Sequence, residues 1–121
     1  MKRCLIVDDS RVIRRVAAKI IQDLGLSADE AESGQKALEA CRVHMPDLAL
    51  IDVDMPGMDG RSYLRALRAL PGGDKVVAIL CATDCSAAQI EADLAAGADE
   101  YIMKPFDSDI VRTKLLLLDV L

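Results

Sequence analysis

The chain has 121 residues, of which 52% are hydrophobic and 29% are charged, so it can form one sizeable core and is too apolar for a disordered protein. Its formal net charge of −5 argues against direct nucleic-acid binding, which requires a basic surface. The first apolar run meets Asp8 too early for a signal sequence, and no stretch approaches the roughly 20 apolar residues of a membrane span. We expect one cytoplasmic domain over residues 1–121, without membrane insertion.

The first half of the chain alternates short apolar runs with amphipathic segments. Residues 3–7 are typical of a buried strand, and the apolar residues after them recur at helical spacing until Gly25, a common helix stop. A weaker strand is predicted over residues 27–31. Ser33 can then cap a second helix, and residues 48–51 form an apolar strand that ends at an aspartate.

The second half repeats this alternation. A helix with apolar residues between positions 63 and 70 is ended by a Pro-Gly-Gly sequence. The remaining predicted elements, in chain order, are a strand over residues 76–81, a helix from Ser86 to Gly97, a strand over residues 100–103, and a last helix capped by Asp107 or Ser108.

Five strand–helix units of this kind indicate a doubly wound α/β sandwich. Strands that are apolar on both faces favour a parallel sheet with helices on each side. Right-handed crossovers and the chain length favour five strands in the order 2-1-3-4-5, the flavodoxin-like arrangement.

Acidic residues follow two of the predicted strands. Asp8 and Asp9 come after the first strand and Asp52 after the third, while Lys104 follows the fifth. The carboxyl ends of parallel strands meet at one edge of the sheet, so these side chains should lie together. Each aspartate alone could be a turn or cap residue, but crowded carboxylates repel one another. A hard divalent cation such as Mg²⁺ relieves that repulsion.

Three motifs in this order resemble the receiver domains of two-component response regulators, most closely the single-domain chemotaxis type. They are VDDS at residues 7–10, LIDVDMPGMDG at residues 50–60 and GADEYIMKPF at residues 97–106. The resemblance covers essentially the whole chain.

The resemblance implies a role for each matching residue. Asp52 would accept a phosphoryl group from a phosphohistidine, and Lys104 would pair with that group. Asp8, Asp9, Asp52 and the backbone carbonyl of Asp54 would hold Mg²⁺. The family's cis peptide bond would fall at Lys104-Pro105. The domain would modify itself rather than turn over a free metabolite, so we do not expect an enzyme.

The chain departs from the family pattern at its expected switch residue. Ala82 stands where the family usually has Thr or Ser, so the hydroxyl that links the phosphoryl group to the fourth helix is missing. Thr83 could substitute only if the strand ends before it, because successive strand residues face opposite sides. We favour weakened coupling. Tyr101 aligns with the family's aromatic switch residue, although a partly buried edge tyrosine is an equal interpretation.

The resemblance also indicates partners: a sensor histidine kinase or phosphotransfer protein upstream, and a protein target bound by the face of the fourth helix, fifth strand and fifth helix. Four consecutive leucines, residues 115–118, exceed what one core-facing stripe needs. A homodimer through the last two helices would explain them, as would a helix end packed on its own domain.

Three alternatives remain at this point. A pseudo-receiver would be an interaction module that never uses Asp52, and Ala82 favours it. A haloacid-dehalogenase-type phosphatase also carries an aspartate pair, but places it after the first strand. Zinc at Cys41-x-x-His44 or Cys81-x-x-x-Cys85 is less favoured than four small buried cysteines.

Overall fold

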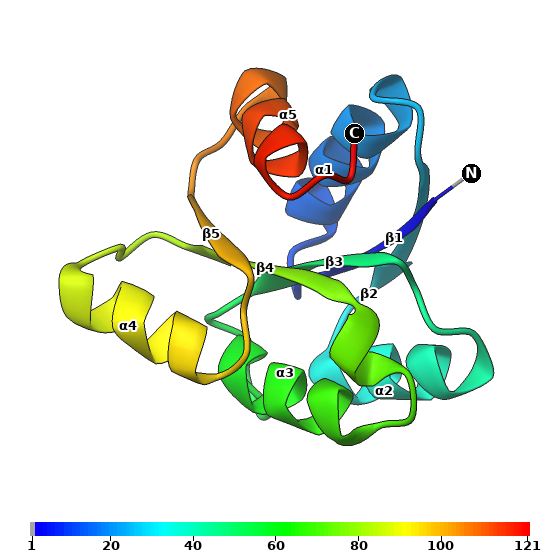
Figure 1. Ribbon diagram of the computed structural model, residues 1–121, viewed down its shortest axis with the longest axis vertical. Coiled ribbons are helices and arrows are strands. Elements are labelled where there is room, and N and C mark those ends of the chain that lie inside the picture. The colour runs from blue at the N-terminus through cyan, green and yellow to red at the C-terminus, as the bar shows by residue number, and fades with distance from the viewer. Residues whose placement is uncertain (1) are drawn as a thin grey trace.

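Strands and helices alternate along the chain in the computed structural model, which describes residues 2–121 (Figure 1). Within this range the elements are β1 (Arg3–Val7), α1 (Arg11–Asp23), β2 (Ser27–Ala31), α2 (Gly34–Val43), β3 (Leu48–Asp52), α3 (Gly60–Ala69), a 3₁₀ turn (Gly73–Lys75), β4 (Val77–Ala82), α4 (Ala87–Ala95), β5 (Glu100–Met103) and α5 (Ser108–Leu117).

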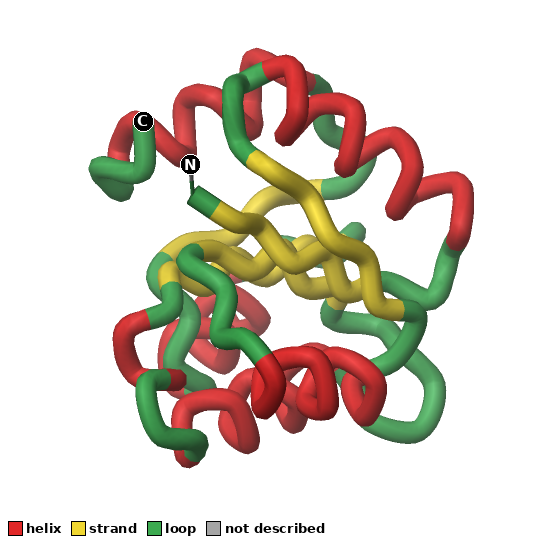
Figure 2. Tube along the Cα trace, turned by 90° about the vertical axis from the view of Figure 1, so that its right-hand side faces the viewer, coloured by secondary structure: helices red, strands yellow, loops and turns green. Residues whose placement is uncertain are grey.

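The strands form one parallel sheet in the order β2-β1-β3-β4-β5, which confirms the predicted doubly wound arrangement for the part of the chain described. Helices α1 and α5 cover one face, and α2, α3 and α4 cover the other (Figures 1 and 2). Among the described residues, no helix has the length and apolar character to cross a membrane.

Each face of the sheet contributes to its own apolar cluster, because successive strand residues point to opposite sides. In β1, Leu5 and Val7 pack on the side of α2 and α3, whereas Cys4 and Ile6 pack on the side of α1 and α5. Aliphatic side chains supply most of this packing, as the scarcity of aromatic residues requires.

The helix starts explain why these segments fold locally as they do. Each helix is preceded by a residue whose side-chain oxygen accepts a backbone N–H of the first turn, a contact that contributes about 1 kcal/mol. These N-cap residues are Ser10, Ser33, Asp59, Ser86 and Asp107. For the last helix the two predicted alternatives thus resolve to Asp107.

One boundary differs from the prediction at a position that matters for function. The fourth strand covers Val77–Ala82 rather than residues 76–81. The 3₁₀ turn before it was not predicted, and it engages the backbone N–H of Val76, which donates to the Gly73 carbonyl at 3.4 Å. The strand is therefore displaced by one residue, and Ala82 becomes its last member.

The cysteines are free thiols distributed over both faces of the sheet. Cys41 lies in the α2 and α3 cluster, with its Sγ atom 3.4 Å from the hydroxyl oxygen of the fully buried Tyr63. Cys81 belongs to the opposite cluster, where burial raises its pKa to about 12. Cys41 and Cys81 therefore cannot belong to one metal site.

Candidate functional site

The strand register brings Asp8 and Lys104, which follow β1 and β5, and Asp52, the last residue of β3, to one edge of the sheet. Val7 pairs with Ile51, so Asp8 and Asp52 come next on neighbouring strands. Asp52 in turn pairs with Cys81 of β4. Ala82 pairs with Met103, and Lys104 follows directly. Residues separated by up to 96 positions in sequence thereby come together, as parallel topology predicts.

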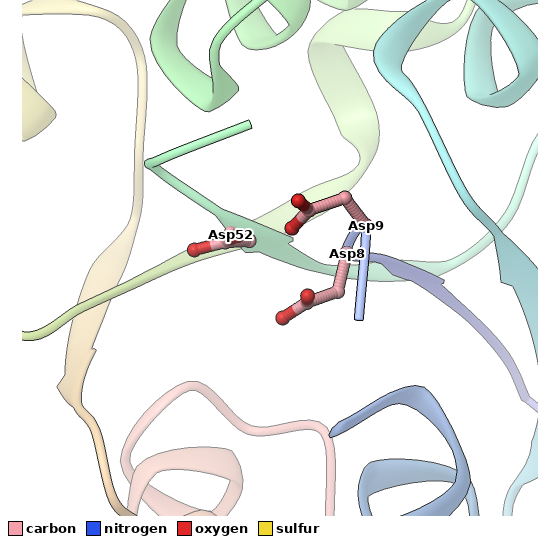
Figure 3. A group of neighbouring side chains, drawn as sticks. All are labelled: Asp8, Asp9 and Asp52. Carbon is pink, nitrogen blue, oxygen red and sulfur yellow. The ribbon is translucent and has the colours of Figure 1, made fainter. Parts of the chain in front are cut away.

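Three carboxylates form a cluster at this edge (Figure 3). Asp8, Asp9 and Asp52 each present an oxygen atom, and these atoms lie within 4.8 Å of one another. Asp8 and Asp52 are buried at 4% and 5% exposure, whereas Asp9 is exposed. The cluster is open to solvent on the Asp9 side.

Lys104 is the cation of the site. Its Nζ donates to Asp8 Oδ2 at 2.9 Å and to Asp52 Oδ1 at 3.0 Å. The lysine side chain is only 16% exposed, so both ion pairs lie in surroundings that screen charge poorly. The Lys104-Pro105 peptide bond is cis, as the resemblance implied.

Burial and ion pairing shift the protonation of these groups. Burial raises the pKa of Asp52, because it outweighs the opposing hydrogen bond and charge of Lys104. For Lys104, burial alone would lower the pKa, but hydrogen bonds to Asp8 and Asp52 outweigh it and raise the pKa. Lys104 is therefore a cation at neutral pH, and Asp52 is a more basic carboxylate than an exposed aspartate.

Backbone amides orient the two buried carboxylates. The N–H of Ser10 donates to Asp8 Oδ1 at 2.8 Å, and the N–H of Asp54 donates to Asp52 Oδ1 at 3.3 Å. The side chain of Asp54 is exposed, so what this residue places beside the cluster is its backbone.

Gly60 packs the end of the loop that follows Asp52 against the backbone of Asp52 and Val53. The sequence alone did not indicate this role. The Gly60 N–H donates to the Val53 carbonyl at 3.0 Å. A β-carbon at this position would lie 2.3 Å from the Asp52 carbonyl oxygen and 2.9 Å from Val53 Cα. The first residue of α3 is thus in direct contact with the backbone of Asp52, an approach that only glycine permits.

Two of the three expected switch residues, Ala82 and Thr83, lie beside Lys104. Ala82 is buried with the α2 and α3 side chains, and its carbonyl accepts the Lys104 N–H at 2.8 Å. Thr83 lies just beyond the end of β4 and is exposed, so it meets the condition for substituting for the missing hydroxyl. It lines the same 260 Å³ hollow as Lys104.

Tyr101 of β5 is partly buried beneath α5. Lys114 Nζ lies 4.4 Å from the centre of its ring and 3.1 Å from Glu100 Oε1. A cation over an aromatic face is an attractive contact, so the ring is held on the edge of the sheet.

Residues 4–116 match the family described as the response regulator receiver domain. The chain belongs to this family. The receiver-domain assignment disfavours the haloacid-dehalogenase-type interpretation, for which the order of the acidic motifs was already unsuitable.

Curated relatives give the same assignment. Response regulator MprA of Mycolicibacterium vanbaalenii is 38% identical over 117 residues, which cover 95% of this chain and 50% of the relative. The transcriptional regulatory protein PhoP of Escherichia coli is 34% identical over 114 residues, with 93% and 50% covered. This receiver domain thus spans about half the length of the curated relatives it matches.

The fold has a near-complete counterpart among solved structures. The chemotaxis protein CheY4 of Vibrio cholerae superposes with a TM-score of 0.92 at 28% identity, covering 97% of this chain and 98% of the other. The likeness extends over both helical layers and the whole sheet, so the receiver domain has the fold predicted from its sequence.

Proposed function

We propose that this receiver domain accepts a phosphoryl group on Asp52 from a phosphohistidine of a sensor histidine kinase or phosphotransfer protein. One observation carries the proposal: Lys104 bridges Asp8 and Asp52 inside a cluster of three carboxylates. The exposed Asp9 marks the side from which a donor can approach.

The residues present fit Mg²⁺. Hard oxygen donors from Asp8, Asp9 and Asp52 can surround one ion, and the Asp54 carbonyl follows Asp52 closely enough in sequence to complete the set. When bound, Mg²⁺ supplies positive charge that offsets the charge of the phosphoryl oxygens.

The receiver domain's own residues position and neutralise the reacting groups. An Asp52 oxygen forms the new O–P bond as the N–P bond of the phosphohistidine breaks, and the imidazole nitrogen leaves with that electron pair and takes up a proton. Burial makes Asp52 more basic and therefore a better nucleophile. Lys104 is close enough to transfer a hydrogen bond from Asp52 to a phosphoryl oxygen.

Incubation with acetyl phosphate and Mg²⁺, followed by phosphate-affinity electrophoresis, tests the proposal. We expect a shifted band in the unmodified protein and in Asp23→Asn, a control on the exposed end of α1. The band should be absent in Asp52→Asn and after chelation of Mg²⁺. A protein that gives no shifted band would be a pseudo-receiver, and a band that survives in Asp52→Asn would place the modification elsewhere.

The proposed output surface is the face formed by α4, β5 and α5. Leu94 and Met103 on this face are 52% and 53% exposed, and Leu116 and Leu117 of α5 are 46% and 67% exposed. A downstream protein target or a second copy of the domain would cover these side chains. Size-exclusion chromatography with and without beryllofluoride, a phosphoryl mimic, separates the two: a dimer shifts the elution volume in the absence of any other protein.

We propose that Ala82 weakens the coupling between Asp52 and α4. A hydrogen bond from a hydroxyl to the charged phosphoryl group contributes roughly 1.5–3 kcal/mol, which alanine cannot supply. With beryllofluoride bound, Ala82→Thr should show larger amide shifts in α4 than the unmodified protein. Equal shifts in the two proteins would contradict weakened coupling, and loss of the shifts in Thr83→Ala would assign the missing role to Thr83.

A further inference from the structure

Helix α4 is attached to the domain by a buried charge. Of its nine residues, all of them described, only Asp93 is buried, at 2% exposure. The large side chain next to it, Leu94, is 52% exposed. In Figure 1 this helix lies out beside the β5 edge of the sheet. Ile90 and Ala92 are only partly buried, and full apolar burial begins at Ala96, the residue that ends the helix. Apolar packing, which fixes most helices on a sheet, therefore contributes less to the middle of α4 than to the other helices.

The partner of Asp93 is Arg61 in the first turn of α3. Arg61 Nε donates to Asp93 Oδ1 at 2.7 Å, and its second terminal nitrogen donates to Gln89 Oε1 at 2.6 Å. The side chains of Arg61 and Asp93 are 21% and 3% exposed. A buried carboxylate of this kind requires its cation, so α4 is held where Arg61 holds it.

Arg61 directly follows Gly60, which is in close contact with the Asp52 backbone. The backbones of Gly60 and Asp52 are packed so closely that a β-carbon on residue 60 would lie 2.3 Å from the Asp52 carbonyl oxygen. A displacement of the backbone around Asp52 must therefore move the start of α3, and the Arg61 side chain with it.

The far end of α4 is fixed by a second arginine of α3. Arg68 donates to the Gly97 carbonyl at 3.1 and 2.7 Å, and also to the Gly73 and Val76 carbonyls at 2.8 and 2.5 Å. Arg61 and Arg68 are seven residues apart, which places them on one face of α3. The C-terminal end of α4 is thus held by hydrogen bonds from Arg68 to the Gly97 backbone carbonyl. The middle of the helix is held by the ion pair between Arg61 and Asp93.

We propose that Arg61 is the positioning residue through which phosphorylation of Asp52 moves α4, by way of its contact with Asp93 and Gln89, with the Arg68–Gly97 contact as the pivot. This inference rests on the proposed function, because it needs an event at Asp52. It supplies a route from the site to the output face that does not involve the hydroxyl absent at Ala82. The ion pair can act in this way because a charged hydrogen-bonded contact has discrete partners, whereas an apolar contact slides.

Hydrogen–deuterium exchange of the full chain, with and without beryllofluoride and Mg²⁺, tests the inference. The compared proteins are the unmodified chain, Arg61→Gln, Asp93→Asn, and Arg65→Gln as a matched control. Arg65 is an exposed arginine of the same helix, so the control removes the same charge. In the unmodified chain and in Arg65→Gln, we expect beryllofluoride to change exchange both at residues 52–60 and in α4.

In Arg61→Gln and Asp93→Asn, the amides of α4 should exchange about tenfold faster without the mimic, since the contact that closes the helix is lost. The mimic should still alter residues 52–60 and should leave α4 nearly unchanged. Asp93→Asn retains the side-chain shape, so it keeps the test valid if Arg61→Gln folds poorly. A purely structural contact would change the basal exchange of α4 but not its response.

The two failures are distinguishable. If residues 52–60 of the unmodified chain do not respond to the mimic, the proposed function and this inference both fail. If those residues respond while α4 of Arg61→Gln and Asp93→Asn responds as strongly as α4 of Arg65→Gln, the role of Arg61 is refuted and the proposed function stands.

Discussion

Helices α1 and α4 pack against the same sheet but are held on it by different interactions. Helix α1 buries four apolar side chains: Ala17, Ala18, Ile20 and Ile21. Helix α4, described over its whole length, buries only the carboxylate of Asp93. Apolar burial stabilises a helix wherever surfaces fit, at about 1.5–3 kcal/mol for each large side chain, while an ion pair stabilises one particular arrangement. The comparison suggests which part of the domain is scaffold and which part can change position.

Substitutions in the apolar face of α1 should have the largest effect on the free energy of unfolding. Ile21→Ala removes a fully buried side chain of α1 and should lower the free energy of unfolding by about 2–5 kcal/mol. Leu94→Ala on α4 should change it by less than about 0.5 kcal/mol, because that side chain is half exposed. Urea denaturation followed by circular dichroism measures both. Similar losses in the two variants would show that α4 is packed as firmly as α1.

A smaller effect should follow from releasing the pivot of α4. Arg68→Ala leaves the carbonyls of Gly73, Val76 and Gly97 without this donor and should cost about 1–3 kcal/mol. Hydrogen exchange should increase most around Gly97 and in the turn before β4. The control is Arg65→Ala on the exposed side of α3, where stability should be almost unchanged. Increased exchange confined to α1 would contradict a pivot at this position.

The smallest effect concerns the start of α3, on which the attachment of α4 depends. Asp59 caps this helix through the Ser62 N–H at 2.8 Å, and Asp59→Ala should cost about 0.5–2 kcal/mol at pH 7. That backbone hydrogen bond lowers the pKa of Asp59 below its ordinary value of 3.8. The cap's contribution is therefore complete above pH 3.8 and is lost as the pH falls through the lowered pKa of the folded state.

Urea titrations of both proteins at several acidic pH values check the sign of this dependence. The difference in stability between the unmodified domain and Asp59→Ala should shrink as the pH falls. A difference that grew towards low pH would mean that the carboxylate is not the group that caps α3.

The sheet and the carboxylate cluster could be predicted because both depend on short-range patterns. Apolar runs ending at Asp8 and Asp52 identify strand ends, and parallel topology then brings those ends together. Family resemblance supplied the residue roles, which no spacing could assign. The displacement of β4 was not predictable from its apolar run, since Val76 and Val77 are the same residue type and only the turn before them decides where pairing begins.

The contact between Arg61 and Asp93 was missed for a different reason. Helix α4 has small alanine side chains on all sides, so hydrophobic periodicity does not reveal which face turns inward. From the sequence, an aspartate in such a helix is expected to be exposed to solvent. Only the position of α3 shows that Asp93 is buried. Asp93 lies three positions after Ile90, the one isoleucine of α4, a spacing that places the two residues on the same side of the helix.

The two tyrosines, Tyr63 and Tyr101, lie in different surroundings and provide intrinsic fluorescence. The chain has no tryptophan, so excitation at wavelengths that tyrosine absorbs and phenylalanine does not yields emission from Tyr63 and Tyr101. Tyr63 is wholly buried beside Cys41 and out of reach of an aqueous quencher, whereas Tyr101 is partly exposed on β5 with Lys114 over its ring. An aqueous quencher should therefore act on Tyr101 and leave Tyr63 unaffected, which makes Tyr101 a label-free reporter on the proposed output face.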